Sequence, residues 1–417
     1  MSHLPRTTQQ PSSTDATETT TEVDARISTA SPVEHPLRDI FFVSNSVDEL
    51  GGVTSWSHQM ARLFSDLGHT VQVIGITPAP EGRQAALGDG LPYGTTSLYE
   101  AHPPKGQSLK GVSGRLNVAE RRRQAARRAG MEEQAAKLTR MFRAARPGAV
   151  VIVTQVWAME WVALADTKGL TVIGMSHESF KASRKTSRFQ RIKRWYPEVD
   201  RLLVLTREDA DLWICQQMNN VGFMPNPLPF FPDEPSRREA KTVVSIGRLS
   251  HEKGVDMLLD TWAQVAPGHP DWRLKIFGTG EDEAKLQQLA ADLGITGSVD
   301  WMGRTDDVPQ ALRESSVFTL TSRDEGFPLA PMEAMASAVP CVAFDMAPGI
   351  REIITDGEDG YVVRPGNTAE FAARLDSLMS DRDLRDRMGT AGRESIQRFS
   401  TERITARWED LFAFLER

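Results

Sequence analysis

The segment VVSIGRLSHEKG, residues 243–254, joins an apolar run to a glycine, two cations and the start of a helical pattern. The apolar run has the length of a buried strand, and Gly247 allows a tight turn directly after it. Arg248 and Lys253 place two positive charges where that strand ends. Because arginine offers a planar fork and lysine a compact charge, the pair suits a diphosphate. The segment therefore predicts a strand–turn–helix unit with an anion site at its turn.

The same alternation of apolar runs and helical patterns continues on both sides of this segment. Further strands are expected at residues 40–43, 71–76, 150–153, 170–175, 202–205, 274–277, 317–320 and 341–344. Five prolines between residues 225 and 235 interrupt the alternation and mark a linker. Strands that alternate with helices form parallel sheets covered on both faces. The chain is therefore expected to be α/β, with two doubly wound domains that face a central cleft beyond the carboxyl ends of their strands.

The composition is that of a globular protein with two domains. The chain has 417 residues, of which 40% are hydrophobic and 25% charged, and its net charge of −7 disfavours a nucleic-acid binder. Cys215 and Cys341 have no C-x-x-C spacing, so neither a disulfide framework nor a structural zinc is expected. We find no signal peptide and no apolar run of about 18 residues that could span a bilayer. A cytoplasmic location is expected.

Two carboxylates flank a helix start in EGFPLAPME, residues 325–333. Pro328 suits the first turn of a helix, which leaves Glu325 in the preceding loop and Glu333 inside the helix. Both carboxylates could face the cleft and accept hydrogen bonds from sugar hydroxyls. An isolated pair of this spacing would more simply be a capped helix with solvent-exposed acids. The cations Arg248 and Lys253 in the same half favour a nucleotide-sugar site instead.

His177 follows the expected strand at residues 170–175 and should lie at the sheet edge that faces the cleft. A histidine there could equally cap a loop or pack in the core. Gly278-Thr279-Gly280 also follows a strand, but the full G-x-G-x-x-G of a dinucleotide site is absent, so no nicotinamide or flavin is expected.

The strings GRLSHEKG and SRDEGFPLAPMEAMASAVPCVAFD resemble the family-four group of retaining glycosyltransferases. The likeness extends from residue 38 to residue 415, and it includes Gly51-Gly52 and Pro225-Asn226-Pro227. It implies a GT-B fold of two Rossmann-like domains and a nucleotide diphosphate sugar as co-substrate, without a cofactor. Residues 345–352 depart from the family's commoner arrangement, which leaves the donor-sugar preference open.

The resemblance also assigns roles to single residues. Glu325 would contact hydroxyls of the donor sugar, Glu333 the ribose, and Arg248 and Lys253 the diphosphate, while His177 would lie near the reacting sugar. The implied catalytic residues are Glu325, His177, Arg248 and Lys253. The implied donor-binding residues are Gly51, Gly52, Gly247, Arg248, Lys253, Glu325, Gly326, Phe327, Pro328, Leu329 and Glu333.

A metal-independent reaction is expected, because neither D-x-D string lies beside a strand. Residues 209–211 and 381–383 fall in polar helical stretches and are interpreted as solvated helix faces. Arg248, Lys253 and helix N-termini would then neutralise the diphosphate.

A basic helix is expected in KASRKTSRFQRIKR, residues 181–194, which has seven Lys or Arg and no acid. Seven positive charges without a counter-charge suggest an anionic partner. The expected acceptor-binding residues are Lys181, Arg184, Lys185, Arg188 and Arg191. The partner could be a phosphate-bearing polymer, a lipid phosphate or an anionic membrane surface. For a second cluster, Arg121 to Arg128, a solvated helix face is the favoured interpretation.

Taken together, the sequence resembles the teichoic-acid and wall-polymer glucosyltransferases. This implies transfer of a hexose, glucose or N-acetylglucosamine, from a UDP-sugar to a hydroxyl of a cell-surface polymer, its lipid-linked precursor or a related glycan. The alternatives are a GT-B-fold epimerase and a catalytically silent sugar-nucleotide-binding protein or membrane adaptor. The protein would be cytoplasmic, with peripheral contact to the inner face of the plasma membrane.

The expected organisation has five parts. They are a disordered tail (1–37), an acceptor-side domain (38–228), a linker (229–240), a nucleotide-sugar domain (241–398) and a C-terminal helix that packs back toward the first domain (399–417).

Overall fold

The computed structural model describes residues 35–88, 90–102 and 118–416. The described residues from Arg38 onward form one compact unit, which contains both sheets. The tail expected at residues 1–37 lies almost entirely outside the described residues. No helix in the described part of the chain is long and apolar enough to cross a membrane.

The first sheet of the described chain has seven parallel strands in the order β3-β2-β1-β4-β5-β6-β7. The short strand β4, VVIV, is buried along its whole length, as expected for a sheet covered on both faces. The strand order reverses between β1 and β4, which makes the loops after these strands a natural binding position. The strands are β1 Asp39–Ser44, β2 Thr70–Gly75, β3 Gly94–Ser97, β4 Val150–Val153, β5 Thr171–Met175, β6 Arg201–Val204 and β7 Val221–Phe223.

The helices of this first domain are α2 Gly52–Asp66, α4 Val118–Arg143, α5 Met159–Val162, α6 Phe180–Arg184, α7 Ser187–Trp195 and α8 Arg207–Ile214. The expectation of one basic helix over residues 181–194 is wrong. Thr186 has extended backbone angles, and its hydroxyl accepts a hydrogen bond from the Arg188 N–H. Because this is the geometry of a helix N-cap, the stretch divides into α6 and α7.

The second sheet has six described parallel strands in the order β10-β9-β8-β11-β12-β13. They are β8 Thr242–Ile246, β9 Arg273–Phe277, β10 Val299–Gly303, β11 Val317–Leu320, β12 Cys341–Phe344 and β13 Gly360–Val363. The surrounding helices are α9 Val255–Val265, α10 Glu283–Asp292, α11 Val308–Arg313, α12 Leu329–Ala336, α13 Pro348–Ile353, α14 Thr368–Ser380 and α15 Arg382–Ser395. The prediction of two doubly wound, parallel domains is confirmed.

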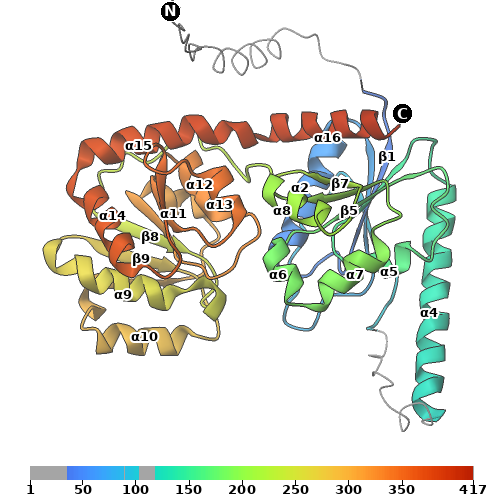
Figure 1. Cartoon of the computed structure of the whole chain (residues 1–417), viewed down its shortest axis with the longest axis horizontal. Coiled ribbons are helices and arrows are strands. Elements are labelled where there is room, and N and C mark those ends of the chain that lie inside the picture. The colour runs from blue at the N-terminus through green and yellow to red at the C-terminus, as the bar shows by residue number, and fades with distance from the viewer. Residues whose placement is uncertain (1–34, 89, 103–117, 417) are drawn as a thin grey trace, which may run out of the picture. The chain divides into compact units, whose positions relative to one another are not determined.

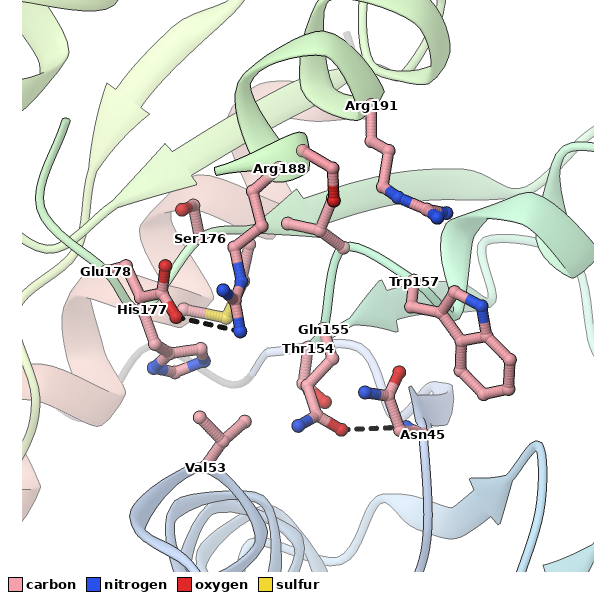
Figure 2. Close-up of a pocket in the computed structure, with 13 residues that line it drawn as sticks. Asn45, Val53, Thr154, Gln155, Trp157, Ser176, His177, Glu178, Arg188 and Arg191 are labelled. Atoms are coloured by element: carbon pink, nitrogen blue, oxygen red, sulfur yellow. Dashed lines mark hydrogen bonds and ion pairs between the residues drawn. The ribbon is translucent and has the colours of Figure 1, made fainter. Parts of the chain in front are cut away.

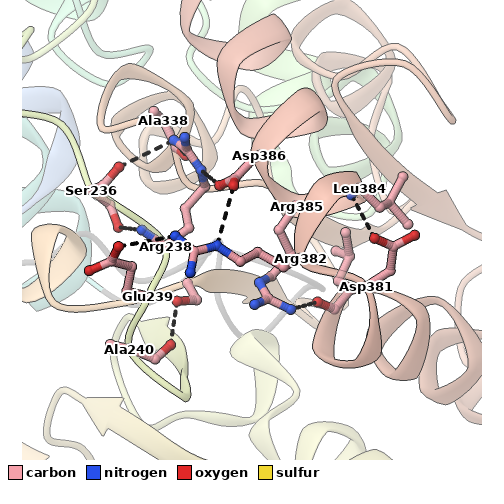
Figure 3. A network of polar contacts seen from close by, with 12 residues as sticks. Ser236, Arg238, Glu239, Ala240, Ala338, Asp381, Arg382, Leu384, Arg385 and Asp386 are labelled. Atoms are coloured by element: carbon pink, nitrogen blue, oxygen red, sulfur yellow. Dashed lines mark hydrogen bonds and ion pairs between the residues drawn. The ribbon is translucent and has the colours of Figure 1, made fainter.

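The end of the segment that joins the two sheets is held against the second domain. Arg238 donates to Asp386 of α15 at 2.8 Å and to the carbonyl oxygens of Ser236 and Ala338 (Figure 3). Glu239 accepts from Arg382 at 3.0 Å. These contacts fix the chain before β8 begins.

The last helix, α16 Thr401–Leu415, returns to the first domain and packs on α2. Trp408 is fully buried, with its ring 6.2 Å from that of Trp56 and 6.1 Å from that of Phe64. The buried Glu409 pairs with Arg38 at 3.2 Å and with His69 at 2.9 Å. One continuous core cluster therefore extends from a face of the first sheet through α16 to the second domain.

The packing of α16 predicts that Trp408→Ala lowers the free energy of unfolding by about 3–5 kcal/mol, because it empties a closely packed aromatic site. Urea unfolding followed by circular dichroism measures the change. Phe414→Ala is the matched control, since Phe414 lies on the same helix and is 59% exposed; its effect should stay within about 0.5 kcal/mol. Equal effects of the two substitutions would show that α16 does not hold the domains together.

Candidate active site

The turn after β8 is built by close backbone contacts with the loop after β9. The Leu249 N–H donates to the Thr279 carbonyl at 3.0 Å. A Cβ at Gly278 would lie 1.8 Å from the Gly247 carbonyl oxygen, and one at Gly280 would lie 2.1 Å from that of Leu249. The two glycines after β9 are therefore needed for this loop packing, which accounts for the partial glycine pattern.

Lys253 and Glu325, which the sequence placed in one site, are in contact. Lys253 ends a short 3-10 helix, His251–Lys253, and the next residue, Gly254, has a φ of +62°. The lysine Nζ lies 2.5 Å from Glu325 Oε1, and the Ser322 hydroxyl donates to the same oxygen at 2.8 Å. The carboxylate is thus held in place by one cation and one hydroxyl.

Arg248 and Gly247 lie beside this pair in the same turn. Arg248 is exposed and forms no ion pair within the described part of the chain. A Cβ at Gly247 would contact the aliphatic part of Lys253 at 3.7 Å, so the lysine chain lies over the glycine. The turn consequently presents two cations, one paired and one open to a ligand.

Glu333 lies in the second turn of α12, which begins directly after Pro328. Burial raises the pKa of Glu333 to about 7. Phe327, just before this helix, is buried and packs edge-on against Phe399 with ring centroids 5.4 Å apart. Leu329, the first residue of α12, is half-buried. Phe327 and Leu329 therefore support the loop that carries Glu325.

The loop of Glu325 meets the first domain at Gly326. A Cβ on Gly326 would lie 2.1 Å from the His177 carbonyl oxygen, so no side chain fits there. On its other side, a Cβ on Gly349 would lie 2.7 Å from the Gly326 carbonyl oxygen. Asn226 of the proline-rich seam donates to the Phe327 carbonyl at 3.3 Å. The loops after β5 and β11 are therefore adjacent.

His177 borders a cavity of about 300 Å³ at the carboxyl ends of β1, β4 and β5 (Figure 2). Its ring packs edge-on against Trp56 with centroids 4.7 Å apart, and burial lowers its pKa to about 4. The imidazole is therefore neutral at neutral pH. Its Nε2 is buried and has no hydrogen-bond partner among the described residues.

Polar residues that the sequence reasoning did not identify line the same cavity. Asn45, Thr154 and Ser176 each directly follow a strand, and Gln155 accepts from the Asn45 N–H at 2.8 Å. Such groups can hydrogen-bond sugar hydroxyls. The signal was present in the sequence, since each is a polar residue within two positions of the end of an apolar run.

The glycine loop before α2 has open space around it. A Cβ at Gly51 or Gly52 would meet no atom within 4 Å. Gly51 lines a separate cavity of about 290 Å³ with His58 and Tyr93, whereas Val53 lines the cavity of His177. The start of α2 therefore lies between two cavities of the first domain.

The residues of the basic stretch occupy different positions. Arg188 and Arg191 lie over the His177 cavity (Figure 2). Lys185 and Arg188 line another cavity, of about 310 Å³, together with Asp324 and Glu325 of the second domain. Lys181 and Arg184, on α6, are exposed. The stretch thus borders both the first-domain cavity and the Glu325 loop.

The expectation that these charges lack counter-charges is wrong for two of them. Arg188 pairs with Glu178 at 2.9 Å, and Arg191 pairs with Glu160. Both glutamates lie outside residues 181–194, so a count of charges within the stretch could not find them.

The interpretation of residues 209–211 as a solvated face is wrong for Asp209. This side chain is buried, and it accepts hydrogen bonds from the Phe180 N–H and the Thr206 hydroxyl, both at 2.8 Å. It joins α8 to the start of α6. Asp381 caps α15 by accepting from the Leu384 N–H. Metal independence remains a prediction.

Comparison with known proteins agrees with this architecture. Residues 229–395 match the family described as "Glycosyl transferases group 1". An "uncharacterized glycosyltransferase" of Haemophilus influenzae is 35% identical over 214 residues, which cover 51% of this chain and 61% of that protein. An amylovoran biosynthesis glycosyltransferase of Erwinia amylovora is 31% identical over 224 residues, which cover 52% of this chain and 63% of that protein. The chain thus spans less than two thirds of either relative.

A solved structure of S. aureus TarM with Fondaparinux, alpha-GlcNAc-glycerol and UDP matches over 90% of this chain and 100% of its own, with a TM-score of 0.72 and 16% identity. At this identity the likeness concerns the fold. The GT-B fold that the sequence motifs implied is confirmed.

The pKa of Glu333 predicts a pH-dependent stability. The pKa is about 7 in the folded protein, whereas its ordinary value is 4.5. Between these two pH values the folded state therefore retains a proton on Glu333 that the unfolded state has released. Stability should therefore fall as the pH rises through that window. Glu333→Gln, which stays neutral, should be more stable than wild type at about pH 8 and equally stable at about pH 4.

Thermal melting at the two pH values measures the difference. The exposed Glu358 supplies the control, and Glu358→Gln should match wild type at both. If Glu333→Gln gains no stability at the higher pH, the buried, ionised carboxylate of Glu333 does not lower the free energy of unfolding.

Proposed function

Residues 229–395 belong to the group 1 glycosyl transferases, in a chain with the GT-B fold, and from this premise we propose that the protein is a retaining glycosyltransferase. Its donor is a UDP-hexose, glucose or N-acetylglucosamine, and its acceptor is a hydroxyl of a cell-surface polymer, its lipid-linked precursor or a related glycan. One observation carries the proposal: the Lys253–Glu325 pair lies in the loop region that abuts the backbone of His177.

The second domain supplies the donor site in this proposal. Arg248 and Lys253 neutralise the diphosphate at the carboxyl end of β8, and Glu325 accepts hydrogen bonds from hydroxyls of the donor sugar. Glu333 binds the ribose. UDP in the TarM structure supports a UDP-sugar donor. Fixed cations can carry the charge of the diphosphate, so the reaction needs no metal ion.

Transfer with retention uses the same face of the sugar for the leaving group and the acceptor. The bond from the anomeric carbon to the diphosphate oxygen breaks, a new bond forms to the acceptor oxygen, and the departing diphosphate oxygen takes the acceptor proton. Lys253 stabilises the charge that develops on the diphosphate. His177, neutral because of its lowered pKa, acts through its free Nε2 as a hydrogen-bonding group and not as a general acid.

The acceptor binds to the first domain in this account. The cavity beneath Arg188 and Arg191 offers hydroxyl-binding groups together with positive charge. Lys181 and Arg184 of α6, and Lys185 directly after it, add further positive charge, which favours an anionic polymer or a lipid-linked acceptor. Work on such an acceptor would take place in the cytoplasm, at or near the inner face of the plasma membrane.

Hydrolysis of a panel of nucleotide sugars, with and without EDTA, tests the proposed activity. We expect slow release of UDP from UDP-glucose or UDP-N-acetylglucosamine, undiminished by chelation. NMR of the freed sugar should show the α-anomer first, because retention preserves the donor configuration. Epimerised donor without release would support an epimerase, binding without turnover would support a silent protein, and loss of activity on chelation would contradict the metal-free reaction.

Neutralising either donor-site cation should impair catalysis without unfolding the protein. Lys253→Ala and Arg248→Ala should each lower kcat/KM by about 10²-fold, the equivalent of roughly 3 kcal/mol of lost charge stabilisation. Lys285→Ala, an exposed lysine of α10, is the control and should retain full activity. If either site variant works as well as this control, its cation does not contact the diphosphate.

A further inference from the structure

The N-terminal half of α4 carries a second group of positive charges. Residues 118–130 contain five arginines and one acid, Glu120. Within the described part of the chain, the exposed Arg121 and Arg122 form no ion pair, while Arg128 pairs with Glu132 at 2.9 Å. Arg123 pairs with Glu120 at 3.9 Å, so Arg121 and Arg122 are the arginines of this group that supply exposed positive charge without an ion pair among the described residues.

One of these arginines faces the body of the domain. Glu120, Arg127 and Gln134 are spaced by seven residues and so share one face of the helix. Glu120 and Gln134 are buried, and Arg127 is half-buried between them. Burial and the charge of Arg127 lower the pKa of Arg191, so the side chains of α4 and α7 lie close enough for their charges to interact.

A short helix connects the two basic elements physically. The helix α5 packs on α4 (Figure 1). Its Glu160 pairs with Arg191 of α7. Arg191 and Arg188 line the cavity of His177, and Arg188 and Lys185 line the cavity that reaches Glu325. Basic side chains, those of α7 each paired with one glutamate, therefore continue from α4 across α7 to the candidate active site. We define these residues of α4 and α7, Arg121 to Arg128 and Arg188 to Arg191, as the basic track.

The length of the track indicates the kind of ligand it fits. Arg121 and Arg128 are separated by about 10 Å along the helix axis, at 1.5 Å per residue. A small anion can engage only one part of such a surface. A linear polymer with charges at regular intervals can engage α4 and α7 at the same time, and it can still reach the cavity.

The composition of α4 disfavours a bilayer as the partner. A helix that lies in the membrane interface needs a face of bulky apolar side chains. Residues 119–130, AERRRQAARRAG, contain no apolar side chain larger than alanine. The track therefore offers charge without an apolar face to insert.

We propose that the basic track binds the acceptor as a linear polyanion, with α4 holding the part of the chain that lies beyond the active-site cavity. This inference rests on the proposed function, and it makes α4 a binding element of the enzyme. It predicts that acceptor affinity depends on chain length.

Polyphosphate binding to the full-length protein tests the proposal. The variant Arg121→Gln/Arg122→Gln/Arg128→Gln removes three charges from α4, and Lys285→Gln/Arg304→Gln/Arg387→Gln removes three exposed charges from the second domain as a matched control. For long-chain polyphosphate, the α4 variant should bind about 10-fold more weakly, with a log–log salt slope smaller by about 2. Tripolyphosphate can engage only one part of the track, so its affinity should fall less than that of the long chain.

Equal affinities of the α4 variant and the control for the long chain would overturn the proposal. So would a loss of binding to phosphatidylglycerol vesicles with unchanged polyphosphate affinity, which would identify a membrane surface instead. Equal melting temperatures of both variants confirm that folding is intact. UDP-sugar hydrolysis is measured in parallel. If the wild-type protein hydrolyses no donor, the proposed function alone is contradicted. If hydrolysis is normal but the α4 variant depends on polyphosphate length as the wild type does, the track alone is contradicted.

Discussion

The backbone contact between Gly326 and the His177 carbonyl is the constraint on which the candidate site depends. Because a Cβ at residue 326 would lie 2.1 Å from that oxygen, the two loops can approach only through a glycine. The contact places the Glu325 loop of the second domain beside the cavity of the first domain. Two further features hold the domains in this arrangement: α16 packs its aromatic side chains on α2, and Asn226 bonds the Phe327 carbonyl.

Charged side chains lie on both sides of this contact. On the second domain, Lys253 pairs with Glu325, and Arg248 is exposed and has no ion pair among the described residues. On the first domain, His177 is neutral and Arg188 and Arg191 are each paired with one glutamate. Cations that contact carboxylates are thus present on both sides of the contact between the two loops. In the proposed reaction, the cations of the second domain hold the diphosphate and the first domain holds the hydroxyl-bearing chain.

Much of the fold could be predicted because parallel sheets bury nearly continuous apolar runs, which are visible in a single sequence. The contact of Lys253 with Glu325 was likewise predictable in outline, since both residues follow neighbouring strands of one sheet. The partners of Arg188, Arg191 and Asp209 were not, because they come from segments that only the tertiary structure brings together. Residues 181–194 divide into two helices because Thr186 caps the second one. This local signal was present in the sequence, but the prediction gave more weight to the basic composition of the stretch.

The most direct test of this account measures two properties of the Gly326→Ala variant. They are its transfer rate at saturating UDP-sugar and its affinity for UDP. Gly297→Ala is the control, because a Cβ there meets no atom within 4 Å. The added methyl group must push the His177 and Glu325 loops apart, and a displacement on the order of 1 Å can cost about 10²-fold in rate. We expect that loss of transfer with UDP affinity close to wild type, since the cations of the second domain remain in place. Transfer at the rate of the control would contradict the claim that this contact assembles the active site.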